Sequence, residues 1–284
     1  MSLETFGIIC GFFAALCQAL NYTFSKDCQE KYALHGFRQL LAVHLAMFVM
    51  ALVPFVLLGF HRYLSTFMLL YLAGVVGPYL LAQYILIKVL DRTDASVVSP
   101  LLTIKIPILA FIAMVFMGQR FTFIQCLSIA TIIALGFYFS SLSGRARPLL
   151  LLALAGACTC FSLSDISMTH LTRHLDLPRL QAVVISSCYE YFVCGLLALP
   201  FAHRFQVGFV HAWHAKWVAA TWFACTLAFV VTFSVNGVVE GNIIQTLRSV
   251  MGVIIAYLFY RRYIKDPNTF RKKLFITAGM FAAV

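Results

Sequence analysis

The sequence predicts an all-α integral membrane protein of about ten transmembrane helices, arranged as two inverted repeats of five. Of the 284 residues, 62% are hydrophobic and 11% are charged, a balance that excludes a soluble globular domain and a disordered chain. Apolar stretches of about 20 residues, the length that crosses a bilayer, recur along the whole chain. Landmark residues of the first half also return in the second half.

Apolar length and the polar residues between apolar stretches predict ten spans. The first stretch follows no basic segment and has no small-residue cleavage site, so we expect a span and not a signal peptide. The last stretch ends at Val284, which fits a truncated tenth span. The connections are short, and no sizeable soluble domain is expected. The predicted spans are residues 5–25, 36–60, 65–88, 95–117, 121–142, 148–169, 179–202, 213–236, 241–262 and 268–284.

The repeat is predicted from landmarks that recur 146 positions apart. They divide the chain into two units, residues 1–144 and 145–284, with five spans each. An odd number of spans inverts the second unit relative to the first, and inverted repeats with a site near the bilayer midplane are an architecture of transporters. The matched landmarks are Pro54 with Pro200, Asp94 with Glu240 and, one residue further, Thr122 with Thr269.

The net charge of +11 is spread over many short connections. Membrane lipids, and not nucleic acid, are therefore the expected counterparts of the basic residues. Fifteen Lys and Arg residues fall to the odd-numbered connections, and four to the even-numbered connections and termini. The positive-inside rule then places both termini outside. The nine cysteines lack the spacing of a disulfide framework, so no disulfides are expected.

Lys105 and Arg248 are the two of the 21 Lys and Arg residues that are assigned to no connection or terminus. Each lies deep in a predicted span, where a lysine costs about 2.5–3.5 kcal/mol on insertion scales. With the 146-residue offset, Arg248 falls on Leu102, one helical turn from Lys105 and on about the same face. Two cations converging on a cavity suit a carboxylate, phosphate or sulfate group. The structural alternative is an ion pair with Glu190 or hydrogen bonds to backbone carbonyls.

Glu190 is the only acidic residue that the predicted spans place near a span centre. It precedes Pro200 by ten residues, as His44 precedes Pro54, so the two occupy equivalent places in the repeat. Buried carboxyl and imidazole groups can titrate near neutral pH, which proton coupling requires. We therefore predict Glu190 and His44 as coupling groups. A permanent ion pair for Glu190 and a hydrogen bond inside the bundle for His44 are the alternatives.

Uncharged polar side chains within the spans are further candidates for substrate contact. Gln18 and Asn21 lie three residues apart and so share a helix face. Hydrogen bonding between helices accounts for such residues without a ligand, and this alternative stays open. The predicted substrate-binding residues are Lys105, Arg248, Gln18, Asn21, Gln83, Tyr79 and Gln245.

Motifs of enzymes and metal sites are weak or absent in the sequence. It contains no Gly-rich phosphate loop, no nucleophile elbow and no zinc-protease motif. His170 and His174 have the spacing of metal ligands on a helix, but they lie at a span end beside Arg173. We expect no enzymatic activity, no cofactor and no metal.

Residues 90–122 carry the pattern of a known family. Leu90 is followed by a polar turn, then by Ala95 at a helix start, Pro107 within the helix and Gly118 at its end. This order and spacing resemble the EamA-like branch of the drug/metabolite transporter superfamily. The resemblance implies ten helices in a five-plus-five inverted repeat, and a secondary carrier of small metabolites that works by alternating access. It also implies cytoplasmic termini, against the charge count.

The sequence thus predicts a secondary active transporter, an exporter, of a small anionic or zwitterionic metabolite in a bacterial inner membrane. Its partners would be this substrate and the surrounding lipids, with a homodimer left open. One alternative is a carrier or flippase for an amphipathic or lipid-linked anion. Another is a non-transporting scaffold or receptor, which would bury Lys105 and Arg248 in closed ion pairs with no cavity between the halves.

Overall fold

The computed structural model describes residues 2–57, 59–63, 65–90, 101–141 and 148–248, with a few single positions beyond. Within these ranges every regular element is helical, so the predicted all-α class is confirmed. The start of the fourth predicted span lies outside the described residues. Most of the ninth and tenth predicted spans, residues 241–262 and 268–284, lies outside them as well.

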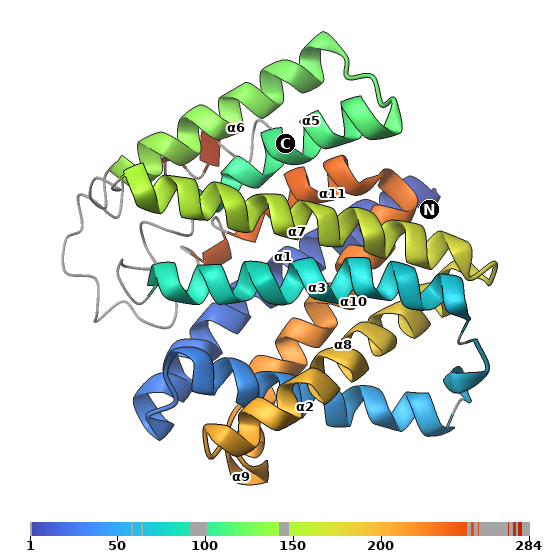
Figure 1. Ribbon diagram of the computed structural model, residues 1–284. Coiled ribbons are helices and arrows are strands. Elements are labelled where there is room, and N and C mark those ends of the chain that lie inside the picture. The colour runs from blue at the N-terminus through green and yellow to red at the C-terminus, as the bar shows by residue number, and fades with distance from the viewer. Residues whose placement is uncertain are drawn as a thin grey trace.

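Six of the described helices are long and apolar enough to cross a membrane (Figure 1). They are α1 (Leu3–Tyr32), α2 (Gly36–Leu57), α3 (Thr66–Leu90), α7 (Pro148–His174), α8 (Arg179–Arg204) and α10 (Lys216–Asn236). The shorter helices are η1 (Phe60–Tyr63), η2 (Leu102–Ile104), α5 (Lys105–Met117), α6 (Phe123–Ser141), α9 (Phe209–His214) and α11 (Val238–Gln245). Many of their outward side chains are large and apolar, as a lipid-facing surface requires.

Two helices extend beyond the predicted span ends. α1 was predicted to end at residue 25 but continues to Tyr32, where Lys26 and Glu30 form an i,i+4 ion pair at 3.8 Å. α7 was predicted to end at residue 169 but continues to His174. The hydroxyls of Thr169 and Thr172 donate to carbonyls four residues earlier, so these polar residues are satisfied inside the helix. Polar residues mark the membrane surface here and not the helix end.

α5 begins at Lys105, directly after the 3-10 turn η2. Pro107, predicted inside a longer helix, therefore lies in the first turn of α5, where its missing N–H breaks no helical hydrogen bond. The helix ends at Gly118, whose φ of 64° is the left-handed conformation that glycine adopts without strain. Lys105 is thus placed at the break between two kinds of helix.

The long helices pack as pairs that each join one half of the chain to the other. α1 lies along α10, α3 lies along α7, and α2 lies along α8. The predicted repeat relates α1, α2 and α3 to α7, α8 and α10. Under this exchange the α1–α10 pair becomes the α7–α3 pair, and the α2–α8 pair is exchanged with itself. These are the pairings that the predicted inverted repeat requires. The division into units at residue 144 stays a prediction.

The N-terminal half of α1 packs closely against the end of α10. Thr232 donates a hydrogen bond of 3.0 Å to the carbonyl of Gly7. A Cβ atom at Gly7 would lie 1.8 Å from Oδ1 of Asn236 and 2.9 Å from a side-chain carbon of Val235, so a larger residue here would require these side chains of α10 to move. We call this contact of Gly7 with Thr232 and Asn236 the glycine seam. It joins the N-terminal part of α1 to the end of α10.

Candidate functional site

A cavity of about 840 Å³ lies inside the bundle, between helices of both halves. Its volume is within the range of pockets for small molecules. Eight of the nine predicted site residues line it: Gln18, Asn21, Tyr79, Gln83, Lys105, Glu190, Gln245 and Arg248. The structure therefore brings residues from most of the described helices into one wall.

His44 is the predicted residue that does not reach this wall. Its side chain is buried in α2, and Nδ1 lies 2.9 Å from the carbonyl oxygen of Leu40. Its ring centre is 5.7 Å from that of Tyr79, which does line the cavity. His44 is therefore one layer behind the wall, in contact with Leu40 and Tyr79, which both line the cavity.

Lys105 forms an ion pair with an acidic residue that the sequence did not single out. Its Nζ lies 2.6 Å from Oδ2 of Asp165 on α7, and Asn242 donates to the same oxygen at 2.9 Å. The structural alternative of a pair between Lys105 and Glu190 is not found, and the statement that Glu190 is the only acid near a span centre is wrong. The predicted span 148–169 leaves Asp165 four residues from its end. The helix continues to His174, and Asp165 lines the cavity.

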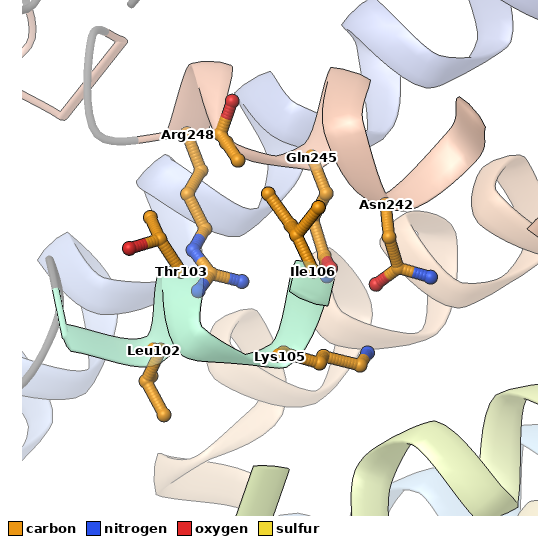
Figure 2. A pocket seen from close by; sticks show the side chains of 8 residues that line it. Leu102, Thr103, Lys105, Ile106, Asn242, Gln245 and Arg248 are labelled. Atoms are coloured by element: carbon orange, nitrogen blue, oxygen red, sulfur yellow. The ribbon is translucent and has the colours of Figure 1, made fainter. Parts of the chain in front are cut away.

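Arg248 is held by amides and not by an acid. It comes from the stretch after α11, and its side chain points toward the start of α5 (Figure 2). Nη1 contacts Oε1 of Gln18 at 3.4 Å, and Gln245 donates to the same oxygen at 3.1 Å. The residue is 8% exposed, and Nε has no hydrogen-bond partner. Among the described residues no carboxylate forms an ion pair with Arg248, so its predicted pairing with Glu190 is not found.

A second, small cavity of about 10 Å³ separates the two cations. That is room for about one water molecule. In Figure 2 the Arg248 side chain descends from one wall, while Lys105 extends from the other wall toward the side of Asn242. The lining residues are Leu102, Thr103, Lys105, Ile106, Asn242, Gln245, Thr246 and Arg248. Both cations also line the large cavity, so its wall has a cationic part at this point.

Another part of the wall carries the carboxyl group of Glu190. This residue lies in the middle of α8 and is 4% exposed. Its Oε2 has no hydrogen-bond partner among the described residues. The phenol groups of Tyr79 and Tyr191 lie within its electrostatic range, and Tyr191 also shares a hydrogen bond with Thr226. This second part of the wall is acidic and aromatic.

Asn21 has a structural contact as well as a place in the wall. Its Nδ2 donates to the carbonyl of Val218 at 2.7 Å and to Thr221 at 3.3 Å. These bonds join α1 to α10, as the structural alternative for uncharged polar residues expected. Asn21 therefore contributes to helix packing whether or not a ligand is bound.

The cavity extends toward one side of the bundle. Along α1 its lining runs from Gln18 to Gln29, and it continues over the start of α2 from Gly36 to Val43. Among the described lining residues of α1, none precedes Gln18. The glycine seam lies toward the other end of α1. The cavity thus leads to the side of the odd-numbered connections, which carries most of the basic residues.

Long apolar helices around a central cavity with polar and apolar lining define a multi-pass membrane protein. The profile of the EamA-like transporter family, part of the drug/metabolite transporter superfamily, matches residues 5–142 of the chain. The resemblance predicted from residues 90–122 is confirmed. The family indicates a membrane transporter of small molecules and is generally non-enzymatic.

The fold is shared with a solved protein of similar length. One crystal structure matches with a TM-score of 0.61, covering 98% of this chain and 95% of the other. At 11% sequence identity the likeness concerns the fold alone. It extends the structural similarity through the second half of the chain, beyond the family match. No curated protein matches the sequence.

Proposed function

We propose that the chain is a secondary active transporter, an exporter, of a small anionic or zwitterionic metabolite in a bacterial inner membrane. The observation that carries this proposal is the position of Arg248. Its guanidinium group borders a cavity large enough for a metabolite and has no ionic partner among the described residues. A charge at this depth is costly, and an entering anion offsets that cost.

The chemistry of the cationic part favours a carboxylate or phosphate group. Arg248 offers a planar fork that can bind two oxygens at once. Lys105 adds a second charge when the anion competes with Asp165 for its ammonium group. Gln18 and Gln245 can turn their amide N–H groups toward the same oxygens. The four side chains together bind an anion without a metal.

Alternating access fits the contrast between the two sides of the bundle. The described lining of the cavity leads toward the basic side, whereas the α1–α10 contact at Gly7 lies toward the other end of α1. If the positive-inside rule holds, the cavity faces the cytoplasm, as an exporter requires for loading its substrate. The family's usual orientation would make the same cavity face outward. Labelling of Gln29→Cys in a cysteine-free background with an impermeant thiol reagent distinguishes the two orientations.

Transport by purified protein in proteoliposomes is the direct test. Vesicles loaded with unlabelled carboxylates, phosphates or sulfates should exchange them for labelled external anions, and protein-free vesicles should not. Zwitterions and neutral analogues of the same size complete the panel. Folded protein that neither binds nor exchanges any of these anions would overturn the proposal.

A carrier or flippase for an amphipathic anion is the second candidate, because the cavity wall also contains Phe161, Trp222, Phe229 and Phe233. Such a protein would prefer single-chain lipid anions to short carboxylates in the same exchange assay. The scaffold or receptor alternative expects closed ion pairs and no cavity. The 840 Å³ cavity and the amide-held Arg248 argue against it.

A further inference from the structure

One buried carboxyl oxygen on the acidic part of the wall, Oε2 of Glu190, has no hydrogen-bond partner among the described residues. Glu190 lines the cavity and is 4% exposed. Tyr79 and Gln83, which line the same cavity, interact with each other through their side chains. Buried polar groups are normally hydrogen-bonded. An unpartnered carboxyl oxygen on a cavity wall indicates a place where a ligand supplies the missing partner.

The side chains around Glu190 are of the kind that holds a positively charged group. Tyr79, Tyr191 and Trp222 line the same cavity as Glu190, and Tyr191 is its neighbour on α8. The faces of Trp and Tyr rings attract ammonium groups, and a carboxylate supplies the opposite charge. A second anion would be repelled here, whereas a protonated amine or quaternary ammonium group would be bound.

Phe161 contributes an apolar ring near both parts of the wall. Its ring centre lies 5.8 Å from Nζ of Lys105 and 6.4 Å from the ring centre of Tyr79, and its side chain lines the same cavity. A ligand that extends along this ring from one part to the other would present an apolar segment to it. Such a ligand would carry its opposite charges at the two ends of an apolar spacer.

We infer that the cavity binds a zwitterion with separated charges: a carboxylate at Arg248, an apolar spacer along Phe161, and an ammonium group between Glu190, Tyr79 and Tyr191. This inference rests on the proposed function for its anionic end and adds the cationic end. It assigns Glu190 to substrate recognition. The same carboxylate still serves proton coupling if the ammonium group and a proton compete for it.

A chain-length series tests the inference on purified protein in lipid nanodiscs. Binding by isothermal titration is compared for glycine, 4-aminobutyrate, 6-aminohexanoate and 8-aminooctanoate, each beside the unsubstituted carboxylate of the same length. The affinity of the amino acids should rise to a maximum within the series. At that length the zwitterion should bind about ten-fold or more tightly than its matched carboxylate, because a charged hydrogen bond is gained.

Two variants separate the inference from the proposed function. Glu190→Gln should remove the ten-fold advantage of the zwitterion while the plain carboxylate binds as before. Glu30→Gln, which removes a carboxylate from an exposed position on α1, should retain the advantage. If Glu190→Gln keeps the preference, or wild type shows none at any length, the inference is wrong and the anion site stands. If no carboxylate binds at all to folded wild type, the proposed function itself fails.

Discussion

Two clusters on the cavity wall each place a basic residue opposite a polar residue of another helix, and we call them the Lys105 corner and the Arg248 corner. They differ in net charge, because only the Lys105 corner contains an acidic residue. In one, Lys105 at a helix break faces Asp165 on α7, the first helix of the second half. In the other, Arg248 after α11 faces Gln18 on α1, the first helix of the first half. Gln18 and Asp165 are 147 positions apart, the offset that also relates Thr122 to Thr269. The two corners are thus equivalent positions of the predicted repeat.

The difference between the corners shows where the protein leaves a charge for its ligand. An acid neutralises Lys105 at 2.6 Å, whereas a neutral amide faces Arg248 at 3.4 Å. A buried charge is tolerated when it is paired and hydrogen-bonded. The Lys105 corner meets that condition by itself, and the Arg248 corner meets it with a bound anion. We therefore propose that Arg248 is the main contact of the anion. Lys105 mainly maintains the structure through Asp165 and reaches the anion only when the anion competes with that carboxylate.

The largest effect on anion affinity is expected from Arg248→Ala, which removes the guanidinium group that is proposed to bind the anion. Loss of one partner from a buried charge pair costs about 2–5 kcal/mol, so anion affinity should fall about 100-fold or more. Titration of the best anion from the exchange panel and its uptake into proteoliposomes measure this. Arg173→Ala, which removes an exposed arginine at the end of α7, is the matched control. Wild-type affinity in Arg248→Ala would contradict the role of the Arg248 corner.

A somewhat smaller effect is expected from Gln18→Glu, which makes the two corners alike. The new carboxylate would pair with Arg248 and compete with the anion, so affinity should fall about ten-fold or more. Gln29→Glu adds the same charge to the same helix, but nearer the mouth of the cavity, and should act less. Equal losses in the two variants, measured by titration, would show that net charge and not the pairing of Arg248 decides binding.

Lys105→Ala should act mainly on stability. It leaves Asp165 without its cation, and since the two side chains are 12% and 19% exposed, we expect a loss of about 2 kcal/mol, below the value for a fully buried pair. The Lys105→Ala, Asp165→Ala double variant should recover most of it. Thermal unfolding in detergent, with anion titration alongside, measures both effects. A single variant that is as stable as wild type would show that the ion pair is not structural.

The smallest effect is expected from Asn242→Ala. The variant removes two hydrogen bonds of 2.9 Å, one to Asp165 and one to the carbonyl of Val238 in the same helix, and keeps the Lys105 ion pair. Such a bond contributes about 0.5–1.5 kcal/mol, so unfolding should shift slightly and anion affinity should change only a few-fold. The same two measurements apply. A loss as large as that of Arg248→Ala would mean that Asn242 itself contacts the anion.

The membrane-crossing helices and the convergence of Lys105 and Arg248 on one cavity could be predicted from the sequence. Both depend on the free-energy cost of placing polar groups in lipid. Apolar length specifies the membrane-crossing helices, and a lysine or arginine inside such a stretch must face the protein interior. Lys105 and Arg248 accordingly line one cavity, together with the polar residues of α1 and α3. The 146-residue offset also placed Arg248 within one helical turn of Lys105, which narrowed the set of candidate site residues further.

The ion pair of Lys105 could not be predicted because it depends on where α7 ends. Thr169 and Thr172 mimic a loop in composition, but their hydroxyls bond back to their own helix, and this places Asp165 deeper than its sequence context suggests. His44 shows that equivalent positions of the predicted repeat need not both reach the cavity. Its equivalent, Glu190, lines the cavity, whereas local bonding to Leu40 and packing on Tyr79 keep His44 behind it.

The glycine seam has a consequence for movement. At Gly7 the backbone of α1 lies against side chains of α10, and two hydrogen bonds join the helices there, from Thr232 to the carbonyl of Gly7 and from Asn236 to the carbonyl of Glu4. Neither bond involves a charged group, so we expect the two helices to separate here at lower cost than at an ion pair. A leucine at position 7 should push the N-terminal part of α1 away from α10 and hinder any step of the transport cycle that brings the two helices together.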